Sequence, residues 1–520
     1  MTALALGAGF VVSLWLPLVD GWLGPWNPRP NYEKRAFAEK PVLFGGGDDE
    51  GAHAAQVKTG NDFLARLDAY PRAYEAWYDD HFGLRSHLLH AHNLFKARVL
   101  ATAPNTEVVI GRDDWLYYGG QLNIEQYRAV EPMPEEILTG WLRYFAMVRE
   151  FVEDHGSDYV LVIGPSKHTI HPEYLPRRIT RVGEVTRREQ FLEALAEEGE
   201  QWVLDLTPSL LEAREREETY QETDTHWNSW GSLVATRALI DELLAARAAG
   251  AERYRGLQAL DLERYDRQLR EQAGGDIAGL MGLSESYRTV SPVYEWIGEA
   301  PYSWTTAGLP PGLHPYHEPY VATYEERFLP PQGLPTALVF HDSFGPYLAG
   351  FLPTFFARTA FFWQYPPSPE AVSQEEADVV IQEIGERVLI RDELKGGDVP
   401  FPLDERIRVD FERRRRFFAS DRTLTEGPGA PAAAGSLKRF GDAASGAGEE
   451  EADAAIVRFV VRVTGPGATL RWTRGDGEPL ERKLVPGRNV VYLDWDGAAA
   501  SWSVDPEQGG EVVALEARAQ

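Results

Sequence analysis

Two short motifs, far apart in the chain, contain side chains that together can transfer an acyl group. Ser343 lies in the run ALVFHDSFG, directly after an apolar stretch that predicts a buried strand. A serine at the carboxyl end of a strand in an open α/β sheet lies where such sheets bind their ligands. Alone, this motif is a weak indication, because a serine that caps a helix has the same surroundings in sequence.

The second motif, DTHW at 224–227, contains a base and the group that orients it. Asp224 and His226 are two positions apart, so in an extended segment their side chains point to the same side. Asp224 can then accept a hydrogen bond from one ring nitrogen, which leaves the other free as a general base. We expect Asn228 and Ser229 to cap the helix that follows. A purely structural Asp–His pair is the alternative.

Together the motifs contain the three groups needed for acyl transfer through a covalent intermediate. We predict that Ser343 is the nucleophile, His226 the base and Asp224 the acid. Asp342 is a rival for the acid, but as the neighbour of the serine we expect it to stabilise the turn. Backbone N–H groups of Ser343 and a nearby loop residue are expected to bind the oxyanion. No metal site and no cofactor is predicted, because none of the 12 histidines has a spacing such as HExxH.

Composition narrows the class of protein. With 520 residues the chain is too long for one hydrophobic core, so two or three folded units are expected. A net charge of -28 excludes a nucleic-acid partner, which needs a basic surface. The absence of cysteine excludes disulfides and thiol nucleophiles. Aromatic residues make up 12% of the chain, enough for some to stack on sugar rings as well as fill cores.

Changes in composition divide the chain into five parts. Residues 1–22 are apolar over about one membrane span and predict a signal anchor, with a buried core helix as the alternative. A tether at 23–60 leads to a large α/β domain at 61–420. A linker rich in Gly, Ala and Pro at 421–455 then leads to a small β-sandwich at 456–520.

Short apolar strands alternate with amphipathic helices in the large domain. This pattern predicts a parallel sheet covered on both faces, a three-layer α/β/α sandwich. The expected strands are EVVIG, WLYYG, YVLVIG at 159–164, WVLDL at 202–206, ALVFHDS, TAFFW and DVVIQEI, and the expected helices are Glu135–His155, Thr186–Glu198 and Ser229–Ala248.

Two regions stand apart from this pattern. Residues 265–335 are polar, aromatic and rich in proline, and predict a loop insertion that is either a lid over the substrate or a plain surface feature. Runs such as AIVRFVVRV and NVVYLDW predict the strands of the C-terminal β-sandwich. Its Trp472, Trp495 and Trp502 can be platforms for sugar rings or members of its core.

Six phrases occur in an order that resembles the alginate O-acetyltransferase family of SGNH-hydrolase-like proteins. They are HFGLRSHLLHAHNLFKARVL, EVVIGRDDWLYY, IGPSKHTIHPEYLP, DTHWNSWG, GGDIAGLMGL and LVFHDSFG. The resemblance covers about residues 75–390 and implies an SGNH-like α/β/α domain whose acid, base and nucleophile fall on Asp224, His226 and Ser343. The serine block departs from the GDS of SGNH esterases, because His341 replaces the glycine.

The resemblance also implies surroundings for this site. It places Lys167 and Thr169 near the substrate or in a support of the loop, and we add Trp227 and Tyr347 as candidates for substrate binding. It implies a periplasmic or extracytoplasmic protein anchored to the cytoplasmic membrane. The acceptor would be a polysaccharide, and the acetyl donor would come from a membrane-bound acyltransferase partner. The C-terminal module resembles carbohydrate-binding accessory domains.

Three functions fit these observations. The first is an O-acetyltransferase that modifies hydroxyls of an exopolysaccharide, alginate or a similar one, through an acetyl-serine. The second is an SGNH acetylesterase that uses the same residues with water as the acceptor. The third is a non-catalytic glycan-binding scaffold of an export assembly, suggested by the aromatic content and the β module. We rank them in this order, because all three catalytic residue types are present.

Overall fold

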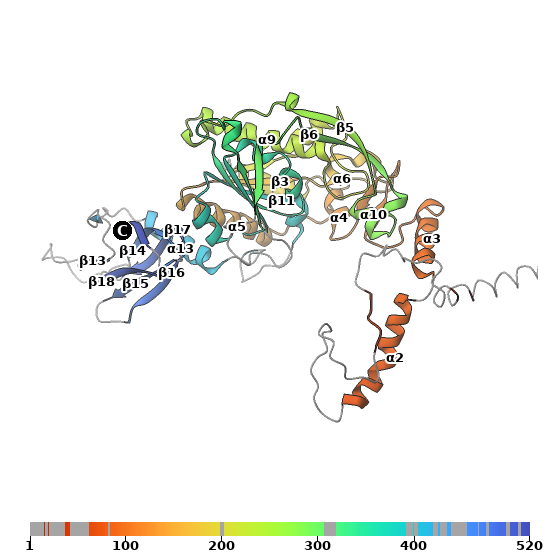
Figure 1. The fold of residues 1–520 in the computed structure, drawn as a ribbon, viewed down its shortest axis with the longest axis horizontal. Coiled ribbons are helices and arrows are strands. Elements are labelled where there is room, and N and C mark those ends of the chain that lie inside the picture. The colour runs from red at the N-terminus through yellow and green to blue at the C-terminus, as the bar shows by residue number, and fades with distance from the viewer. Residues whose placement is uncertain are drawn as a thin grey trace, which may run out of the picture.

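The computed structural model shows a central α/β domain with a smaller β domain at one end and two helices at the other (Figure 1). It describes residues 15, 19, 37–41, 62–81, 84–197, 202–305, 319–391, 399, 404–419, 425–426, 434–437, 455–465, 467–474, 478–495, 500–507 and 511–519. The predicted tether at 23–60, apart from 37–41, and most of the linker at 421–455 lie outside these residues.

A seven-stranded mixed sheet forms the middle of the central domain. Its order is β4 (Val203–Asp205), β3 (Asp158–Gly164), β11 (Val379–Gly385), β9 (Thr336–His341), β10 (Arg358–Trp363), β8 (Tyr320–Tyr324) and β7 (Tyr302–Thr305). The strands from β4 to β10 are parallel, and each was expected from its apolar run.

Helices cover both faces of this sheet. Alternate residues of β3 enter different cores: Tyr159, Leu161 and Ile163 one, Val160 and Val162 the other. This is the two-residue period of a strand buried on both sides, so the predicted three-layer arrangement is confirmed for this domain. The first core takes side chains from α5 (Glu135–Asp154), α7 (Arg187–Glu197), α12 (Pro369–Glu375) and α13 (Glu405–Ala419), and the second from α6 (Lys167–Ile170), α8 (Thr207–Ala213), α9 (Ser229–Ala248) and α11 (Gly345–Leu348).

The prediction of a purely parallel sheet with a loop insertion at 265–335 was wrong. Strand β8 pairs antiparallel with β10, and β7 antiparallel with β8, so part of this segment completes the sheet. Its first part forms a hairpin of β5 (Tyr265–Gln272) and β6 (Thr289–Trp296), with α10 (Asp276–Leu280) between the two strands. These strands could not be recognised from apolar runs, because an edge strand such as β7 or an exposed hairpin such as β5–β6 also contains polar and aromatic residues.

The first two expected strands, EVVIG and WLYYG, are not part of the central sheet. Strands β1 (Val108–Ile110) and β2 (Leu116–Tyr118) pair with each other, outside the central sheet. Their hydrophobic side chains pack with α3 (Arg85–Arg98) and α10, and Asn93 of α3 donates to the Met281 carbonyl at 2.8 Å. Helix α3 therefore braces the segment that follows β5, which also holds part of the candidate site.

The C-terminal domain is a pair of four-stranded antiparallel sheets, as the alternating runs predicted. One sheet contains β12 (Thr425–Glu426), β19 (Glu511–Ala519), β14 (Ala455–Thr464) and β17 (Gly487–Trp495), and the other β13 (Ala434–Leu437), β18 (Ala500–Pro506), β15 (Ala468–Arg474) and β16 (Leu480–Leu484). Trp472 is buried in its core and Trp502 packs against that core, so neither is an exposed platform for sugars. The side chain of Trp495 lies outside the described part.

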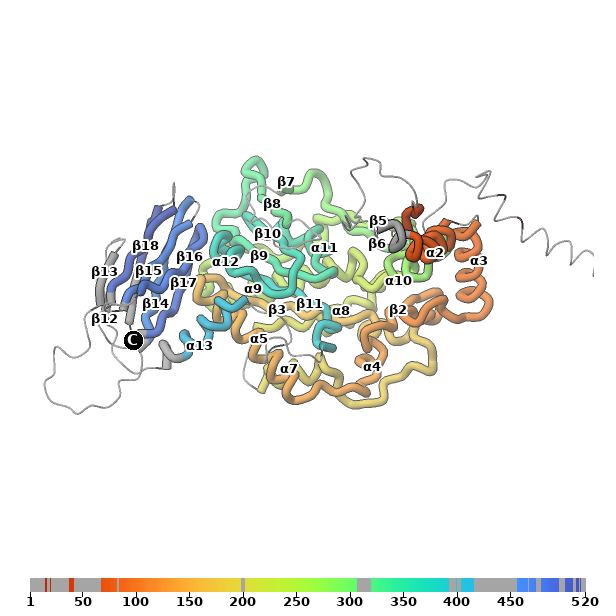
Figure 2. The backbone as a smooth tube through the Cα atoms, turned by 90° about the horizontal axis from the view of Figure 1, so that it is seen from below, coloured from red at the N-terminus to blue at the C-terminus, as the bar shows by residue number. Residues whose placement is uncertain are grey.

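Helix α13 joins the two domains (Figure 2). It packs on α5 of the central domain and on β14 and β17 of the β domain. Across this joint Arg413 forms an ion pair with Asp494 at 3.0 Å, and the Tyr492 hydroxyl donates to Asp154 at 2.6 Å. These partly buried contacts fix the β domain against the face of the sheet that α5 covers.

At the other end of the molecule, α2 (Asp62–His81) precedes α3. Within the described ranges no helix combines the length and the apolar character that crossing a bilayer requires. The predicted anchor at residues 1–22 lies outside those ranges except for Trp15 and Val19, so it stays a prediction.

Candidate active site

The topology of the sheet brings three chain segments together at its carboxyl edge. Strands β3, β11 and β9 are parallel neighbours, so the residues after Gly164, Gly385 and His341 lie side by side. This is the edge at which open α/β sheets bind ligands. Ser343 lies there, two residues beyond the end of β9.

Asp342 fixes the turn that carries Ser343. Its carboxylate is buried and accepts N–H groups from Phe344 at 2.8 Å and from Gly385 at 3.0 Å, while its own N–H donates to Glu383 at 3.2 Å. Burial, with the nearby charge of Asp342, raises the pKa of Glu383 well above its ordinary value. Asp342 therefore ties β9 to β11, which is the turn-stabilising role expected of it.

The DTH motif forms the predicted pair. His226 Nδ1 lies 2.6 Å from Asp224 Oδ1, which also accepts the backbone N–H of His226 at 3.0 Å, and Asp224 Oδ2 accepts the Asp276 N–H at 2.8 Å. Burial acts to raise the pKa of Asp224, but these hydrogen bonds and the His226 charge lower it to about 2. The carboxylate is thus ionised and accepts the Nδ1 proton, which leaves Nε2 as the basic nitrogen.

Of the two residues expected to cap the next helix, Asn228 is the N-cap, whereas Ser229 is the first residue of the helix. The Asn228 side chain caps α9 by accepting the Gly231 N–H at 3.0 Å. An N-cap stabilises the first turn of a helix by about 1 kcal/mol. The base is therefore held two residues from a rigid helix start.

Two of the candidates for substrate binding, Lys167 and Trp227, are buried. The Lys167 ammonium donates to the carbonyls of Gln221, Glu222 and Asp224 at 3.0, 3.1 and 2.6 Å, and its burial lowers its pKa to about 7. Its three donors are used in holding the loop that carries the acid. Trp227 has no exposed surface and packs against Phe344 at a ring distance of 4.8 Å. Lys167 thus supports the loop and also lines a cleft with Phe344 and Arg387, whereas Trp227 is part of the core.

The other two candidates for substrate binding, Thr169 and Tyr347, contact different parts of the site. The Thr169 hydroxyl donates to Glu386 at 2.7 Å, so it too holds a loop after a parallel strand. Tyr347 is half-buried, stacks on the His226 ring at 5.4 Å and accepts a hydrogen bond from Gln221 at 3.2 Å. Tyr347 is thus the predicted substrate residue that borders the base directly.

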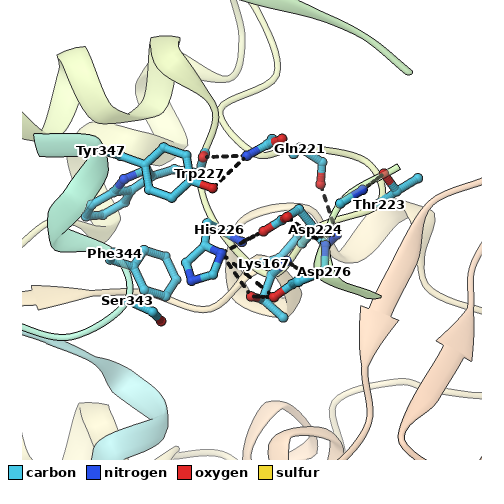
Figure 3. Close-up of polar contacts among 12 residues, drawn as sticks. Lys167, Gln221, Thr223, Asp224, His226, Trp227, Asp276, Ser343, Phe344 and Tyr347 are labelled. Atoms are coloured by element: carbon cyan, nitrogen blue, oxygen red, sulfur yellow. Dashed lines mark hydrogen bonds and ion pairs between the residues drawn. The ribbon is translucent and has the colours of Figure 1, made fainter. Parts of the chain in front are cut away.

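Figure 3 shows Ser343 and His226 next to each other, with Phe344 beside both. The rings of His226 and Phe344 lie 4.9 Å apart. Among the described residues His226 Nε2 has no hydrogen-bond partner. The Ser343 hydroxyl accepts a hydrogen bond from Arg387 at 2.6 Å rather than donating to the imidazole. A rotation of the serine side chain is therefore needed to bring the hydroxyl to Nε2, as is common for ligand-free sites.

Arg387 is a member of the site that sequence reasoning missed. It lies two residues after the end of β11, and its guanidinium both donates to Ser343 and lies over the Phe344 ring at 5.7 Å. A cleft next to it is lined by residues that include Tyr118, Ser166, Thr225, Ile277, Phe344 and Arg387. The rule that carboxyl ends of parallel strands meet would have pointed to it.

Asp276 was also missed, although it lies in the phrase GGDIAGLMGL. Its carboxylate accepts the Thr225 N–H at 2.7 Å and lies 3.8 Å from His226 Nδ1. Partial burial and the charge of Asp224 raise the pKa of Asp276. Within the described residues, Asp224, His226 and Asp276 form a group whose nitrogen and oxygen atoms are close enough to share a metal ion. Three N–H groups already occupy the Asp224 oxygens, however, which favours the acid and base arrangement.

Comparison with known proteins assigns this region. Residues 108–302 match the model of the ALGX family, described as "SGNH hydrolase-like domain, acetyltransferase AlgX". This match agrees with the resemblance to the alginate O-acetyltransferase family, and residues 108–302 are similar to an SGNH-hydrolase-like domain.

Two curated relatives have the same printed name, "Probable alginate O-acetylase AlgJ". The Pseudomonas putida protein is 31% identical over 134 residues, and the Pseudomonas syringae pv. tomato protein 30% identical over 172 residues. The matched region is 26% and 33% of this chain, and spans 33% and 41% of these relatives.

Solved structures with similar chains are more distant. The O-acetyltransferase domain of Pseudomonas putida AlgJ is 20% identical, with a TM-score of 0.37, and is matched over 58% of this chain and 98% of its own. Pseudomonas aeruginosa AlgX is 15% identical, with a TM-score of 0.36, and is matched over 80% of this chain and 93% of its own.

Proposed function

We propose that this protein is an O-acetyltransferase that moves acetyl groups onto hydroxyls of an exopolysaccharide through an acetyl-Ser343 intermediate. The observation that carries the proposal is the imidazole of His226, held by an ionised Asp224, with its free Nε2 beside Ser343. The family match and the AlgJ relatives support acetyl transfer as the chemistry. They support an exopolysaccharide as the acceptor, either alginate itself or, as the chain's charge of -28 favours, a similar polymer that is neutral.

In the first step Ser343 becomes acetylated. The hydroxyl turns from Arg387 toward His226, gives its proton to Nε2 and attacks the carbonyl carbon of the acetyl donor. Asp224, whose carboxylate is ionised, stabilises the imidazolium. The tetrahedral oxyanion collapses, and the leaving group departs with the proton from Nε2. Arg387 is placed to stabilise the negative charge, together with backbone N–H groups of the turn.

In the second step the acetyl group moves to the sugar. A sugar hydroxyl gives its proton to Nε2, and its oxygen attacks the acetyl carbon. The ester bond to Ser343 breaks, and the serine oxygen takes the proton back. Tyr347, which stacks on His226, is placed to position the acceptor ring. Exclusion of water at this stage distinguishes a transferase from an esterase.

The surroundings follow from the same proposal. A polysaccharide on its way out of the cell is met outside the cytoplasm, and the apolar residues 1–22 would anchor the protein to the cytoplasmic membrane. A membrane-bound acyltransferase partner would supply the acetyl group to Ser343. Lys167 and Thr169 act in this proposal as supports of the site.

The test compares acetyl transfer by the wild-type protein and Ser343→Ala. Purified protein, an activated acetyl ester and an oligosaccharide acceptor are incubated, and both acetylated sugar and free acetate are measured. We expect wild-type protein to give acetylated sugar, and Ser343→Ala to give none while it keeps its melting temperature. If the protein releases acetate and the acceptor does not lower this release by forming acetylated sugar, the protein is an esterase instead. Equal transfer by Ser343→Ala would overturn the proposal.

A further inference from the structure

A second cavity opens at the opposite edge of the central sheet. Its volume is about 430 Å³, and its lining includes Leu334, just before β9, and Phe355, just before β10. Because these residues precede parallel strands, the cavity lies at their amino ends, whereas Ser343 lies beyond their carboxyl ends. The cavity is thus separate from the site of acetyl transfer.

Both aromatic rings and hydrogen-bonding groups line this cavity. The rings belong to Tyr265, Trp296, Tyr324, Phe328 and Phe355, and the polar groups to Gln258, Asp261, Arg264, Glu299 and Thr354. A sugar ring has apolar C–H faces that stack on aromatic rings and hydroxyls at its edge that need hydrogen-bond partners. The lining has both, in a cavity of the size that takes a small ligand.

Trp296 has a fixed position in this lining. Its ring packs perpendicular to Tyr265 at 5.5 Å, and Tyr265 in turn packs against Phe351 at 5.5 Å. Tyr265 is buried and Trp296 only half-buried, so a held aromatic side chain faces the cavity. Little side-chain entropy is lost when a ligand binds to such a fixed ring.

The charges of the lining favour an uncharged ligand. Asp261 and Glu299 contribute two carboxylates, and Arg264, 3.9 Å from Asp261, is the one basic side chain among the described residues that line the cavity. Glu299 is paired with Arg327 at the surface. The chain as a whole carries a charge of -28. A polyuronate would be repelled by this field, whereas hydroxyls of a neutral sugar can donate to the carboxylates.

The β5–β6 hairpin connects the cavity to the candidate active site. Tyr265 pairs with Trp296 at the cavity end, and Gln272 pairs with Thr289 at the other end. There the Gln272 side chain donates to Gln221 at 2.9 Å, and Gln221 contacts Tyr347 beside His226. Seven residue steps along β5 span about 24 Å. In Figure 1 the hairpin runs along the outside of the domain toward α10, and β5 is exposed over most of its length.

We propose that this cavity binds an uncharged saccharide segment of the acceptor polysaccharide, and that the chain runs along the β5–β6 hairpin to Ser343. The identification of the ligand as the acceptor rests on the proposed function. The cavity acts as a distant subsite: it holds a long acceptor and takes no part in the chemistry. It therefore favours polymeric acceptors over short ones.

The test is a calorimetric titration of the full-length protein with three probes. These are β-1,4-linked hexasaccharides of glucose, of mannose and of mannuronate. We expect at least one neutral hexasaccharide to bind, and Trp296→Ala to weaken its binding by about tenfold. Leu88→Ala is the control, because Leu88 is an exposed side chain of α3, outside the cavity lining and away from the β5–β6 hairpin, and we expect its binding to equal that of wild type.

A second variant covers the case in which Trp296→Ala does not fold. Glu299→Gln changes an exposed carboxylate of the lining and should also weaken binding while the melting temperature stays unchanged. The proposal is overturned if neither neutral probe binds, or if the mannuronate probe alone binds. It is also overturned if a folded Trp296→Ala or Glu299→Gln variant binds the neutral probe as tightly as wild type. The titration involves no acetyl transfer, so a failure of the proposed reaction at Ser343 leaves its result unaffected.

Discussion

Replacing Asp224 by asparagine tests what its second oxygen and its charge contribute. Oδ1 accepts two N–H groups of His226, and Oδ2 accepts the Asp276 N–H. If the amide oxygen of asparagine faces His226, its NH₂ group meets the Asp276 N–H, which places two donors in contact. If the amide turns round, the NH₂ group faces the imidazole and moves the ring proton to Nε2. The base is then blocked.

The size of the effect follows from these contacts. A buried N–H without a partner costs about 1–3 kcal/mol, so the free energy of unfolding should fall by that amount. Loss of the charged hydrogen bond to the imidazolium costs about 1.5–3 kcal/mol in the transition state, which slows turnover by about 10–150-fold. Where the wrong tautomer predominates, the loss in kcat reaches about 10⁴-fold.

The assay is hydrolysis or transfer of an activated acetyl ester, with kcat and KM measured separately. Asp276→Asn is the matched control, since the Asp276 carboxylate lies 3.8 Å from His226 Nδ1, compared with 2.6 Å for Asp224. We expect Asp224→Asn to lower kcat much more than Asp276→Asn, with little change in KM. A kcat of Asp224→Asn within about threefold of wild type would refute the role given to the carboxylate.

Three further substitutions test the supports of the site and the joint between the domains. Lys167→Met removes three hydrogen bonds to the loop of the acid, so we expect urea titration to show a loss of about 2–4 kcal/mol and kcat to fall; unchanged stability would contradict this. Arg387→Ala should lower kcat for the acetyl ester by about 10²-fold, whereas Arg237→Ala on the exposed side of α9 should not; equal effects would argue against an oxyanion role. Burial raises the pKa of Asp410 to about 7, so as pH rises from about 4 to 7 the unfolded chain loses this proton first and the folded state is destabilised. Asp410→Asn should therefore raise Tm by about 3 °C or more near pH 8 but leave Tm unchanged near pH 4. An equal rise in Tm at both pH values would contradict this prediction.

The sequence was sufficient for the parts of the fold that a single local pattern determines. The apolar runs at β3, β9 and β11 were predicted correctly, because a strand buried on both faces is apolar at most successive positions. The Asn228 cap followed from its side chain and its place before an amphipathic run. The contact between Asp224 and His226 followed from their spacing alone.

Other features depend on partners that are distant in sequence. Strand β8 is recognisable only beside its antiparallel partners β10 and β7, since its short run YVATY is not continuously apolar. The sequence left the role of Lys167 open between substrate contact and loop support, because its neighbours in the chain do not reveal the three carbonyls, 54 to 57 residues away, that its ammonium contacts. Arg387 reaches Ser343 across 44 residues of sequence, and no local motif marks such a contact.

The central claim is that the Ser343 hydroxyl and His226 Nε2 act together to form an acetyl-enzyme. The most direct measurement is mass spectrometry of the purified protein after brief exposure to an activated acetyl ester, with peptide mapping of the adduct. We predict one added acetyl group, about 42 Da, on Ser343 in the wild-type protein and none on this residue in His226→Ala. An adduct on a different residue, or an equal yield on Ser343 without the imidazole, would contradict the account.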